Sequence, residues 1–500
     1  MIYDVIVVGA GVVGALTARE LARYDLKVLV LEAGDDAAAG VTKANSAIVH
    51  GGYAEGPETL KGRLAAAGRR LFPALEAELN FGFRPIGSLV VSFDPDPAPL
   101  EALYRRGLSN GLTDLELWDG PRVRTHEPNL NPAVTGALWC AGAGVCSPWD
   151  LAYAALENAL AHGVEFKLHQ RVVAVEGPLP EVARWRLSTA GTTYETRYVV
   201  NAAGLGGGVL DALAGLGDST LHYRTGEYLV FARDTGARVN SVLFPLPGPL
   251  GKGIVVTPTY QGNLLVGPDA RDEGADAPLL GSTHADRLAH LSAQADRLVG
   301  PLDFKKAIRS FAGIRPLAPG SDFLVGAAHP GSHPGWHRAV GIQSPGLTAS
   351  PALARMLVRG LSEDGLLLPP RPDFDPSRCP LPVHLSRRAD FLPFAQVDAL
   401  TRLPEGDPDR IVCRCEQVRE RDLAEAASRG VPVLTVDALK RRTRAGMGWC
   451  QGRFCRPRTA AWLSGHLGYP VAAQEDAARS GLSRVEGRDL WDLDPSLPSR

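Results

Sequence analysis

The first thirty-two residues constrain the fold most, because an apolar strand, three glycines, a helix, a second strand and an acid follow one another there. The first strand is largely β-branched, as in a buried parallel strand. Gly9, Gly11 and Gly14 form G-x-G-x-x-G, a spacing that permits a tight turn, backbone approach to a pyrophosphate and close helix–strand packing. The second strand, over 27–31, ends at Glu32, whose carboxylate can accept hydrogen bonds from ribose hydroxyls. A tight turn without a ligand is the alternative, but all these parts in register favour a dinucleotide-binding α/β domain.

Length and composition set the broad class. Five hundred residues provide chain for about three domains. A net charge of −2 argues against general attraction to nucleic acid or anionic lipid. The start of the chain has no basic n-region, and no segment is apolar for long enough to span a membrane. We therefore expect a cytoplasmic protein without a nucleic-acid partner or transmembrane segment; any association with the inner membrane would be through a partner.

Two later segments carry small or short polar residues suited to the same ligand. Thr42, Asn45 and Ser46 offer donors and acceptors beside the phosphates, although this stretch can also be an ordinary polar loop. The apolar strand over 198–206 ends in small residues that let the chain pass close to a cofactor. The small residues concerned are Ala203 and Gly204.

A third segment, 338–361, reads as strand, Gly-rich loop and helix. The N-terminus of that helix can point amides at a ring that becomes negatively charged on reduction. The residues at this N-terminus are Gly346, Leu347 and Thr348.

The remaining chain suggests a division into domains. Three apolar strands separated by turns within 225–267 predict an antiparallel sheet. Residues 62–80 have helical spacing, and 85–93 read as a strand. Six prolines within 369–382 predict a stiff linker. We expect nucleotide-binding segments at about 1–80, 148–215 and 325–368, a substrate domain at about 81–147 and 216–324, a linker at 369–405, a cysteine domain at 406–470 and a tail at 471–500.

Four of the seven cysteines lie in the C-terminal region as C-x-C, thirty-four residues, then C-x4-C. They are Cys413, Cys415, Cys450 and Cys455. Four thiolates can hold zinc or a [2Fe–2S] cluster, although zinc knuckles favour C-x2-C pairs. Basic residues surround them, which we expect to ease the negative charge of a cluster or to form a docking face for an acidic acceptor. These residues are Lys440, Arg441, Arg442, Arg444, Arg453, Arg456 and Arg458.

The order of motifs resembles the flavoenzymes of the D-amino-acid oxidase and glycerol-3-phosphate dehydrogenase superfamily. The shared elements are the dinucleotide turn, the T-x-x-N-S…H-G-G segment over 42–52, Y-V-V-N-A-A-G-L-G and G-I-x-S-P-G-L-T. The resemblance implies FAD, with Val172 and Val173 contacting the adenine through their backbone. It also implies that Arg315, in A-G-I-R-P-L, binds the substrate anion. The cysteine region resembles bacterioferritin-associated ferredoxin, in the version fused to glycerol-3-phosphate dehydrogenase-like and opine-oxidase-like flavoproteins, which implies a [2Fe–2S] cluster.

This resemblance implies an α/β fold: a Rossmann-like FAD-binding domain with a discontinuous parallel sheet, an antiparallel substrate domain and a small helical [2Fe–2S] domain. The expected reaction is oxidation of sn-glycerol 3-phosphate to dihydroxyacetone phosphate by hydride transfer to flavin. His50 is our candidate for the base that takes the hydroxyl proton. Lys252 and Arg309 are weaker candidates for a second phosphate-binding cation.

Other functions remain open on sequence grounds. A 2-hydroxy acid dehydrogenase acting on a substrate such as 2-hydroxyglutarate shares the segment around His50. In an amine or opine oxidase, Arg315 would bind a carboxylate. A non-enzymatic electron-transfer accessory fits poorly, because the first 380 residues contain the parts of a flavin site. The chain has no second G-x-G-x-x-G placed for NAD, so we expect electrons to reach an external acceptor, either a quinone or a partner flavoprotein.

Overall fold

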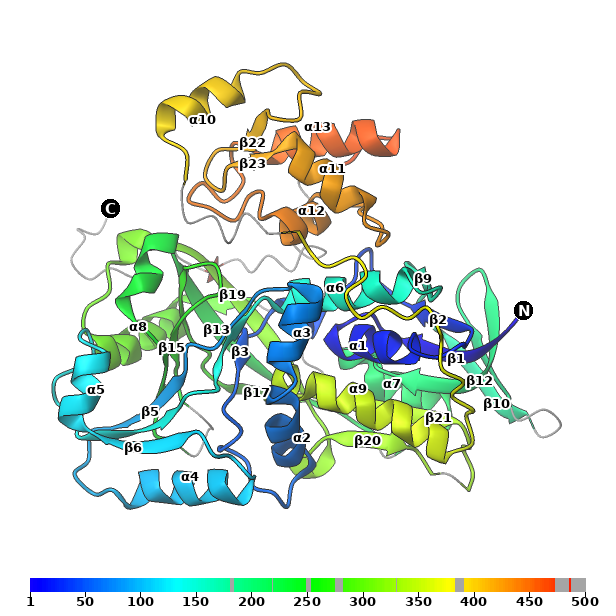
Figure 1. Cartoon of the computed structure of the whole chain (residues 1–500), viewed down its shortest axis with the longest axis horizontal. Helices are drawn as coiled ribbons and strands as arrows, with labels where there is room; N and C mark the ends of the chain where they lie inside the picture. Colours follow the sequence, from blue (N-terminus) through cyan, green and yellow to red (C-terminus); the bar gives the residue numbers. More distant parts are fainter. Residues whose placement is uncertain are drawn as a thin grey trace.

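A computed structural model describes residues 1–179, 184–217, 219–248, 253–274, 282–329, 331–382 and 391–472, and the backbone of 485–486. Two large sheets lie side by side, and a small C-terminal domain sits above them (Figure 1). The predicted Lys252 lies outside the described residues. No helix in the described part of the chain is long and apolar enough to cross a membrane.

The first sheet is mostly parallel and carries the glycine fingerprint. Its order is β10 (Ala174–Leu179), β11 (Arg184–Ser188), β12 (Thr193–Asn201), β1 (Ile2–Val8), β2 (Val28–Leu31) and β9 (Glu165–Lys167). Two further strands belong to this sheet: β21 (Trp336–Val340) pairs with β12, and β20 (Leu324–Ala327) pairs with β21. β1 is parallel to both β12 and β2, whereas β10, β11 and β20 are antiparallel to their neighbours. Segments far apart in the chain therefore build one sheet, as predicted.

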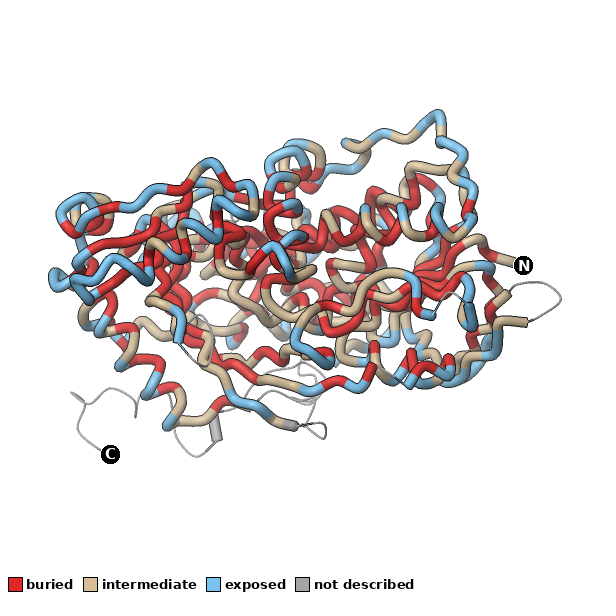
Figure 2. Tube along the Cα trace, turned by 90° about the horizontal axis from the view of Figure 1, so that it is seen from below, coloured by how far each residue is buried: buried red, intermediate tan, exposed pale blue. Residues whose placement is uncertain are grey.

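Helices cover both faces of this sheet because successive strand residues point to opposite sides. One face packs against α1 (Val12–Leu21), α6 (Pro148–Leu160) and α9 (Gly346–Glu363). These three helices share one core, in which α1 contacts both α6 and α9. The opposite face packs against α7 (Gly207–Leu213) around the buried Trp185 and Trp336. Figure 2 shows the buried residues running through the central strands and helices, with exposed residues on the outer loops.

The second sheet is antiparallel except where β14 runs parallel to β5. Its order is β17 (Arg271–Gly274), β13 (His222–Phe231), β16 (Leu264–Val266), β15 (Val256–Pro258), β14 (Val242–Pro245), β5 (Ser88–Ser92), β7 (Gly136–Cys140) and β6 (Leu115–Asp119). The long strand β19 (Ala307–Leu317) pairs along the whole of β13. Three helices pack on this second sheet: α4 (Ala98–Ser109), α5 (Gly120–His126) and α8 (Ala285–Val299).

Short elements join the two sheets. β3 (Ile48–Val49), β8 (Gly144–Cys146) and β4 (Phe83–Arg84) form a small sheet. The helix predicted over 62–80 is in fact two helices, α2 (Leu60–Arg69) and α3 (Phe72–Leu79). A proline lies in the first turn of α3, where its missing N–H is tolerated, whereas it would disrupt the middle of a continuous helix.

The C-terminal domain has its own apolar core. It contains α10 (Phe394–Thr401), β22 (Ile411–Cys413), β23 (Val418–Arg419), α11 (Glu420–Ser428), α12 (Val436–Thr443) and α13 (Arg456–Leu467). Two of these helices, α11 and α12, lie between the cysteine pairs. The proline-rich stretch before this domain is not a free spacer: Leu381 is buried in the large core, and the Pro376 carbonyl accepts a hydrogen bond from Arg19 Nη2 at 2.9 Å.

Candidate active site

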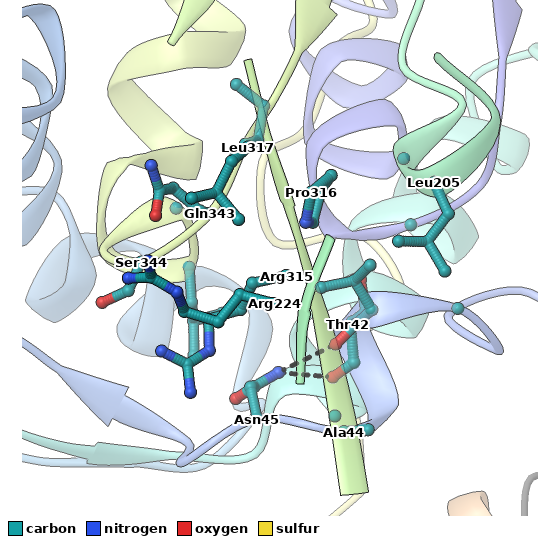
Figure 3. Close-up of a pocket in the computed structure, with 18 of the residues that line it drawn as sticks. Thr42, Ala44, Asn45, Leu205, Arg224, Arg315, Pro316, Leu317, Gln343 and Ser344 are labelled. Atoms are coloured by element: carbon teal, nitrogen blue, oxygen red, sulfur yellow. Dashed lines mark hydrogen bonds between the residues drawn. The ribbon is translucent and has the colours of Figure 1, made fainter. Parts of the chain in front are cut away.

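A cavity of about 1410 Å³ lies between the two large sheets. It exceeds the usual range of roughly 300–1,000 Å³ for a small-molecule site, so it has room for a dinucleotide and a substrate together. One wall comes from the ends of β1, β2 and β12 and from the N-terminus of α9. The other comes from β13, β14 and β19 (Figure 3). Twelve of the fourteen predicted cofactor-binding residues line it: Gly9, Gly11, Glu32, Thr42, Asn45, Ser46, Val172, Val173, Ala203, Gly204, Gly346 and Leu347.

The glycine turn is so closely packed that side chains would not fit in it. Gly9 has φ +103°, and a Cβ there would lie 2.4 Å from the Ala202 carbonyl oxygen. A Cβ on Gly11 would lie 3.1 Å from Thr42 Oγ1, so Gly11 leaves the amides at the start of α1 accessible from the cavity. Gly14 does not line the cavity; its Cβ would lie 1.9 Å from the Gly9 carbonyl oxygen, which makes it a packing residue beneath the turn.

Glu32 occupies the expected place at the end of β2 and also stabilises the turn. Its Oε2 accepts from the Ala10 N–H and its Oε1 from the Gly34 N–H, each at 2.8 Å. Burial raises the pKa of Glu32, and these backbone donors oppose that shift. Each oxygen keeps a second lone pair, so the carboxylate can also accept from a ribose hydroxyl.

The polar loop after Glu32 is held by its own side chains. Thr42 Oγ1 accepts from the Val12 N–H at 3.0 Å. Asn45 Nδ2 donates to the Thr42 carbonyl at 2.8 Å (Figure 3). Asn45 Oδ1 accepts from the Ala47 N–H at 2.8 Å. Ser46 forms a hydrogen bond with Tyr228. These bonds place the loop along the cavity wall, between the glycine turn and the substrate sheet.

His50 also lines the cavity, next to the start of α9. Its backbone N–H donates to Thr348 Oγ1 at 2.9 Å, and the centre of its ring lies 5.7 Å from that of the Phe244 ring. Thr348 itself is buried and is not part of the cavity wall. Its hydroxyl fixes the His50 backbone, while the N-terminal end of α9, at Gly346 and Leu347, lines the cavity.

Two arginines lie opposite each other on the substrate side. Arg315 on β19 is paired with Arg224 on β13, and both line the cavity (Figure 3). Arg315 Nη2 donates to the Asp269 carbonyl at 2.8 Å. A Cβ on Gly226 would lie 2.3 Å from the same nitrogen, so this glycine leaves space for the guanidinium.

The surroundings of this pair are strongly ordered. The Asp269 carboxylate accepts from Arg287 Nε and, at 2.6 Å, from Arg287 Nη2, and its Oδ1 also accepts from the Glu227 N–H. Arg224 forms a bidentate ion pair with Asp272, at 2.6 and 3.0 Å. Sequence reasoning missed Arg224 and Asp269, because only the register of strands distant in sequence places them beside Arg315. Arg309, a weaker candidate, is outside the cavity and donates instead to Gln451 of the C-terminal domain at 3.3 Å.

The four C-terminal cysteines meet as two hydrogen-bonded pairs. Cys413 is paired with Cys455, and Cys415 with Cys450. The hydrogen bond from Cys455 lowers the pKa of Cys413 to about 7, and burial raises that of Cys415 to about 11. The Gly446 and Glu416 N–H groups point at the Cys413 sulfur. This donor set fits a group that carries negative charge on sulfur.

Glycines leave room beside these sulfurs. A Cβ on Gly448 would lie 2.3 Å from Cys415 Cβ, and one on Gly446 would lie 3.8 Å from Cys455 Sγ. Among the described residues, no three or more His, Cys, Asp or Glu side chains are placed to hold a metal ion. Two separate thiol pairs match a [2Fe–2S] cluster, in which each iron takes two cysteines.

A cavity lined by a dinucleotide-binding glycine turn, in a chain that also carries a domain with four clustered cysteines, is typical of a flavin-dependent oxidoreductase with an iron–sulfur domain. The chain belongs to the FAD-dependent oxidoreductase family, whose model, "FAD dependent oxidoreductase", matches residues 4–359. The model of the BFD-like [2Fe–2S] binding domain matches residues 411–464. The cofactors are therefore FAD and a [2Fe–2S] cluster, and the predicted family and fold class are confirmed.

Individual relatives show which members of the family the chain is similar to. The chain is 37% identical over 476 residues to a glycerol 3-phosphate dehydrogenase of Caloramator mitchellensis, covering 95% of this chain and 96% of the relative. It is 31% identical over 368 residues to glycerol 3-phosphate oxidase of Mycoplasma pneumoniae, covering 72% and 94%. The solved structure of dithionite-reduced L-alpha-glycerophosphate oxidase from Mycoplasma pneumoniae with FAD bound has a TM-score of 0.71 at 29% identity, over 76% of this chain and 99% of that one. The chain is thus a glycerol-3-phosphate dehydrogenase-like flavoenzyme.

Proposed function

We propose that this enzyme oxidises sn-glycerol 3-phosphate to dihydroxyacetone phosphate, and that the electrons leave through the [2Fe–2S] cluster to an external acceptor, either a quinone or a partner flavoprotein. The observation that carries the proposal is the Arg224–Arg315 pair on the cavity wall opposite the glycine turn. The similarity to a glycerol 3-phosphate dehydrogenase along nearly the whole chain supports it.

A phosphate dianion is best matched by more than one guanidinium, because arginine offers two parallel donors to phosphate oxygens. Arg315 is pre-oriented by the Asp269 carbonyl, so little side-chain entropy is lost when it binds an anion. Arg224 is paired with Asp272, whose side chain is 64% exposed. An exposed ion pair contributes little, so Arg224 can turn from Asp272 to the substrate at small cost.

Hydride transfer requires the C2 hydroxyl to lose its proton as the hydride leaves C2. When bound, FAD supplies the two-electron acceptor. His50 lines the cavity and is anchored through its N–H to Thr348 at the start of α9. We assign it the role of proton acceptor, since α9 holds its backbone in place at the cavity wall.

The N-terminus of α9 serves the other side of the reaction. Gly346 and Leu347 line the cavity at the positive end of this eighteen-residue helix. The partial positive charge of a helix N-terminus favours an anion nearby. We assign these amides to the flavin ring, where they would stabilise the negative charge that it gains on reduction.

Anaerobic bleaching of the flavin absorbance tests the substrate directly. The FAD- and cluster-loaded protein is mixed in turn with sn-glycerol 3-phosphate, its enantiomer sn-glycerol 1-phosphate, glycerol, 2-hydroxyglutarate and glycine. We expect fast bleaching with sn-glycerol 3-phosphate, followed by the electron paramagnetic resonance signal of a reduced cluster. Bleaching by 2-hydroxyglutarate or glycine, but not by sn-glycerol 3-phosphate, would replace the proposal by one of the alternative functions.

A further inference from the structure

The basic run between the two cysteine pairs is used mainly to attach the C-terminal domain. Arg441 and Arg442 on α12 are buried, and both bind Asp36 of the FAD-binding region. α12 lies directly over α6 in this arrangement (Figure 1). The structure places the guanidinium groups of both arginines at the domain interface, on Asp36, and their effect on the charge of the cluster stays a prediction.

The Asp36 carboxylate is completely buried and receives donors from both domains. Its Oδ2 accepts from Arg441 Nη2 at 2.7 Å, and its Oδ1 accepts from Arg442 Nη2 at 2.8 Å. The Tyr153 hydroxyl of α6 donates to Oδ2 at 2.7 Å, and the Arg442 guanidinium lies 3.9 Å from the centre of the Tyr153 ring. The two guanidinium groups hold the pKa of Asp36 below its usual value against the effect of burial.

Asp36 also belongs to the segment that leads away from the dinucleotide turn. Glu32 and Ala39, on either side of it, line the cavity, and the Ala38 N–H donates to the Ala10 carbonyl at 3.0 Å. Asp36 itself is not part of the cavity wall. The carboxylate therefore joins the structure around the FAD site to α12 without facing the cavity.

A second set of contacts holds the cysteine loops. Arg444 Nε donates to Glu416 Oε2 at 2.8 Å, and Arg444 Nη2 donates to Asn263 of the substrate sheet at 3.3 Å. Arg233 of the substrate sheet region lies 3.3 Å from the same Glu416 carboxylate. Glu416 directly follows a predicted cluster ligand, so these contacts tie the cluster loop to the flavoprotein body.

The energetics favour a persistently docked domain. A buried charge that loses its partner is strongly destabilising, and buried pairs are screened little by salt. Releasing the C-terminal domain would leave Asp36 without its two cationic partners and would expose Val431, which is buried in the core of the FAD-binding region. Electron transfer to the cluster benefits from such a fixed arrangement, since it does not have to wait for a domain to find its position.

We propose that Asp36 is a positioning residue that holds the cluster domain against the FAD-binding domain in the arrangement from which electrons pass to the cluster. This inference rests on the proposed exit of electrons through the cluster. Each transfer moves one electron from reduced flavin to the oxidised cluster, and the external one-electron acceptor must reoxidise the cluster before the second electron follows.

The test compares three variants of the full, cofactor-loaded chain. Asp36→Asn removes the charge from the FAD-binding side, and the double variant Arg441→Met with Arg442→Met removes it from the cluster side. Arg421→Met is the matched control, since Arg421 is half exposed and pairs with Asp409 within the C-terminal domain. The flavin is photoreduced anaerobically with a sacrificial amine as electron donor, and the appearance of the reduced cluster is followed by its paramagnetic signal. Hydrogen exchange over α12 is measured in parallel.

In both interface variants we expect flavin photoreduction at the unmodified rate, faster hydrogen exchange over α12, and cluster reduction at least about tenfold slower as the docked fraction falls. Arg421→Met should change none of these. If Asp36→Asn disturbs FAD binding, the double arginine variant alone tests whether the interface controls cluster reduction, because its substitutions lie outside the FAD-binding domain. Cluster reduction at the unmodified rate in that variant would overturn the inference. Photoreduction that fills the cluster while sn-glycerol 3-phosphate does not bleach the flavin would refute the proposed substrate and leave the role of Asp36 standing.

Discussion

Replacing Arg315 by Met removes the proposed phosphate ligand while keeping most of the side-chain volume. One Nη2 hydrogen of Arg315 is already bound to the Asp269 carbonyl, which leaves donors on the other side of the guanidinium for a substrate. Two charge-assisted hydrogen bonds to phosphate are worth about 1.5–3 kcal/mol each, or about 3–6 kcal/mol together. Because Arg224 remains, we expect the lower part of that range, which corresponds to substrate binding weakened about 10²- to 10³-fold.

The assay separates substrate affinity from the rate of hydride transfer. Anaerobic stopped-flow bleaching at increasing sn-glycerol 3-phosphate gives the apparent Kd and the limiting rate of flavin reduction. For Arg315→Met, the apparent Kd should rise by the stated factor, FAD should remain bound, and the preference for sn-glycerol 3-phosphate over glycerol should largely disappear. Arg315→Lys should recover only part of the affinity, because lysine lacks the planar pair of donors.

Arg271→Met provides a control from the same sheet. Arg271 is exposed, binds Glu273 on its own strand and does not line the cavity. Its replacement should leave both kinetic constants unchanged. If Arg315→Met binds sn-glycerol 3-phosphate as tightly as the unmodified enzyme does, Arg315 does not contact the phosphate and the argument from the arginine pair is wrong.

Three further predictions concern the cofactors and stability. Gly14→Ala places a Cβ 1.9 Å from the Gly9 carbonyl oxygen, so the purified protein should lack flavin absorbance; a full complement of FAD would contradict this. Cys450→Ser should lose iron while keeping FAD and substrate-dependent bleaching, and iron retained at the unmodified content would argue against this ligand. Burial raises the pKa of Glu157 from 4.5 to about 7 despite its ion pair with Arg429. Between pH 4.5 and about 7, Glu157 therefore holds a proton in the folded protein but not in the unfolded protein. Its contribution to the free energy of unfolding is then lost as the pH rises through about 7. Urea unfolding at pH 5 and pH 7.5 should therefore show Glu157→Gln gaining stability relative to the unmodified chain at the higher pH, and parallel pH profiles would exclude the effect.

The cofactor-binding motifs could be predicted because each is encoded locally. Gly9 and Gly11 lie on one turn, and the turn residues at Gly346 and Leu347 begin one helix. Backbone conformation and direction of approach follow there from a few consecutive residues. The roles assigned to these residues in FAD binding remain predictions, as do the domain boundaries and the role of His50.

Other parts of the site depend on residues distant in sequence. Local patterns do not distinguish Arg224 from any other charged residue on a strand, and only the β13–β19 register brings it opposite Arg315. Similarly, the sequence predicts that Thr348, at the start of α9, lies at the flavin, and only the packing shows that its hydroxyl also accepts a hydrogen bond from the His50 backbone.

By itself, the sequence determined the dinucleotide turn, the spacing of the four cysteines and the kind of redox chemistry that they serve, because short-range geometry is set by neighbouring residues. Only the tertiary structure decided which cations line the cavity together and how the two redox domains meet. Asp36 and Arg441 are 405 positions apart, and no periodicity in the chain relates them. Their contact arises from the burial of complementary charges when one folded domain packs against another.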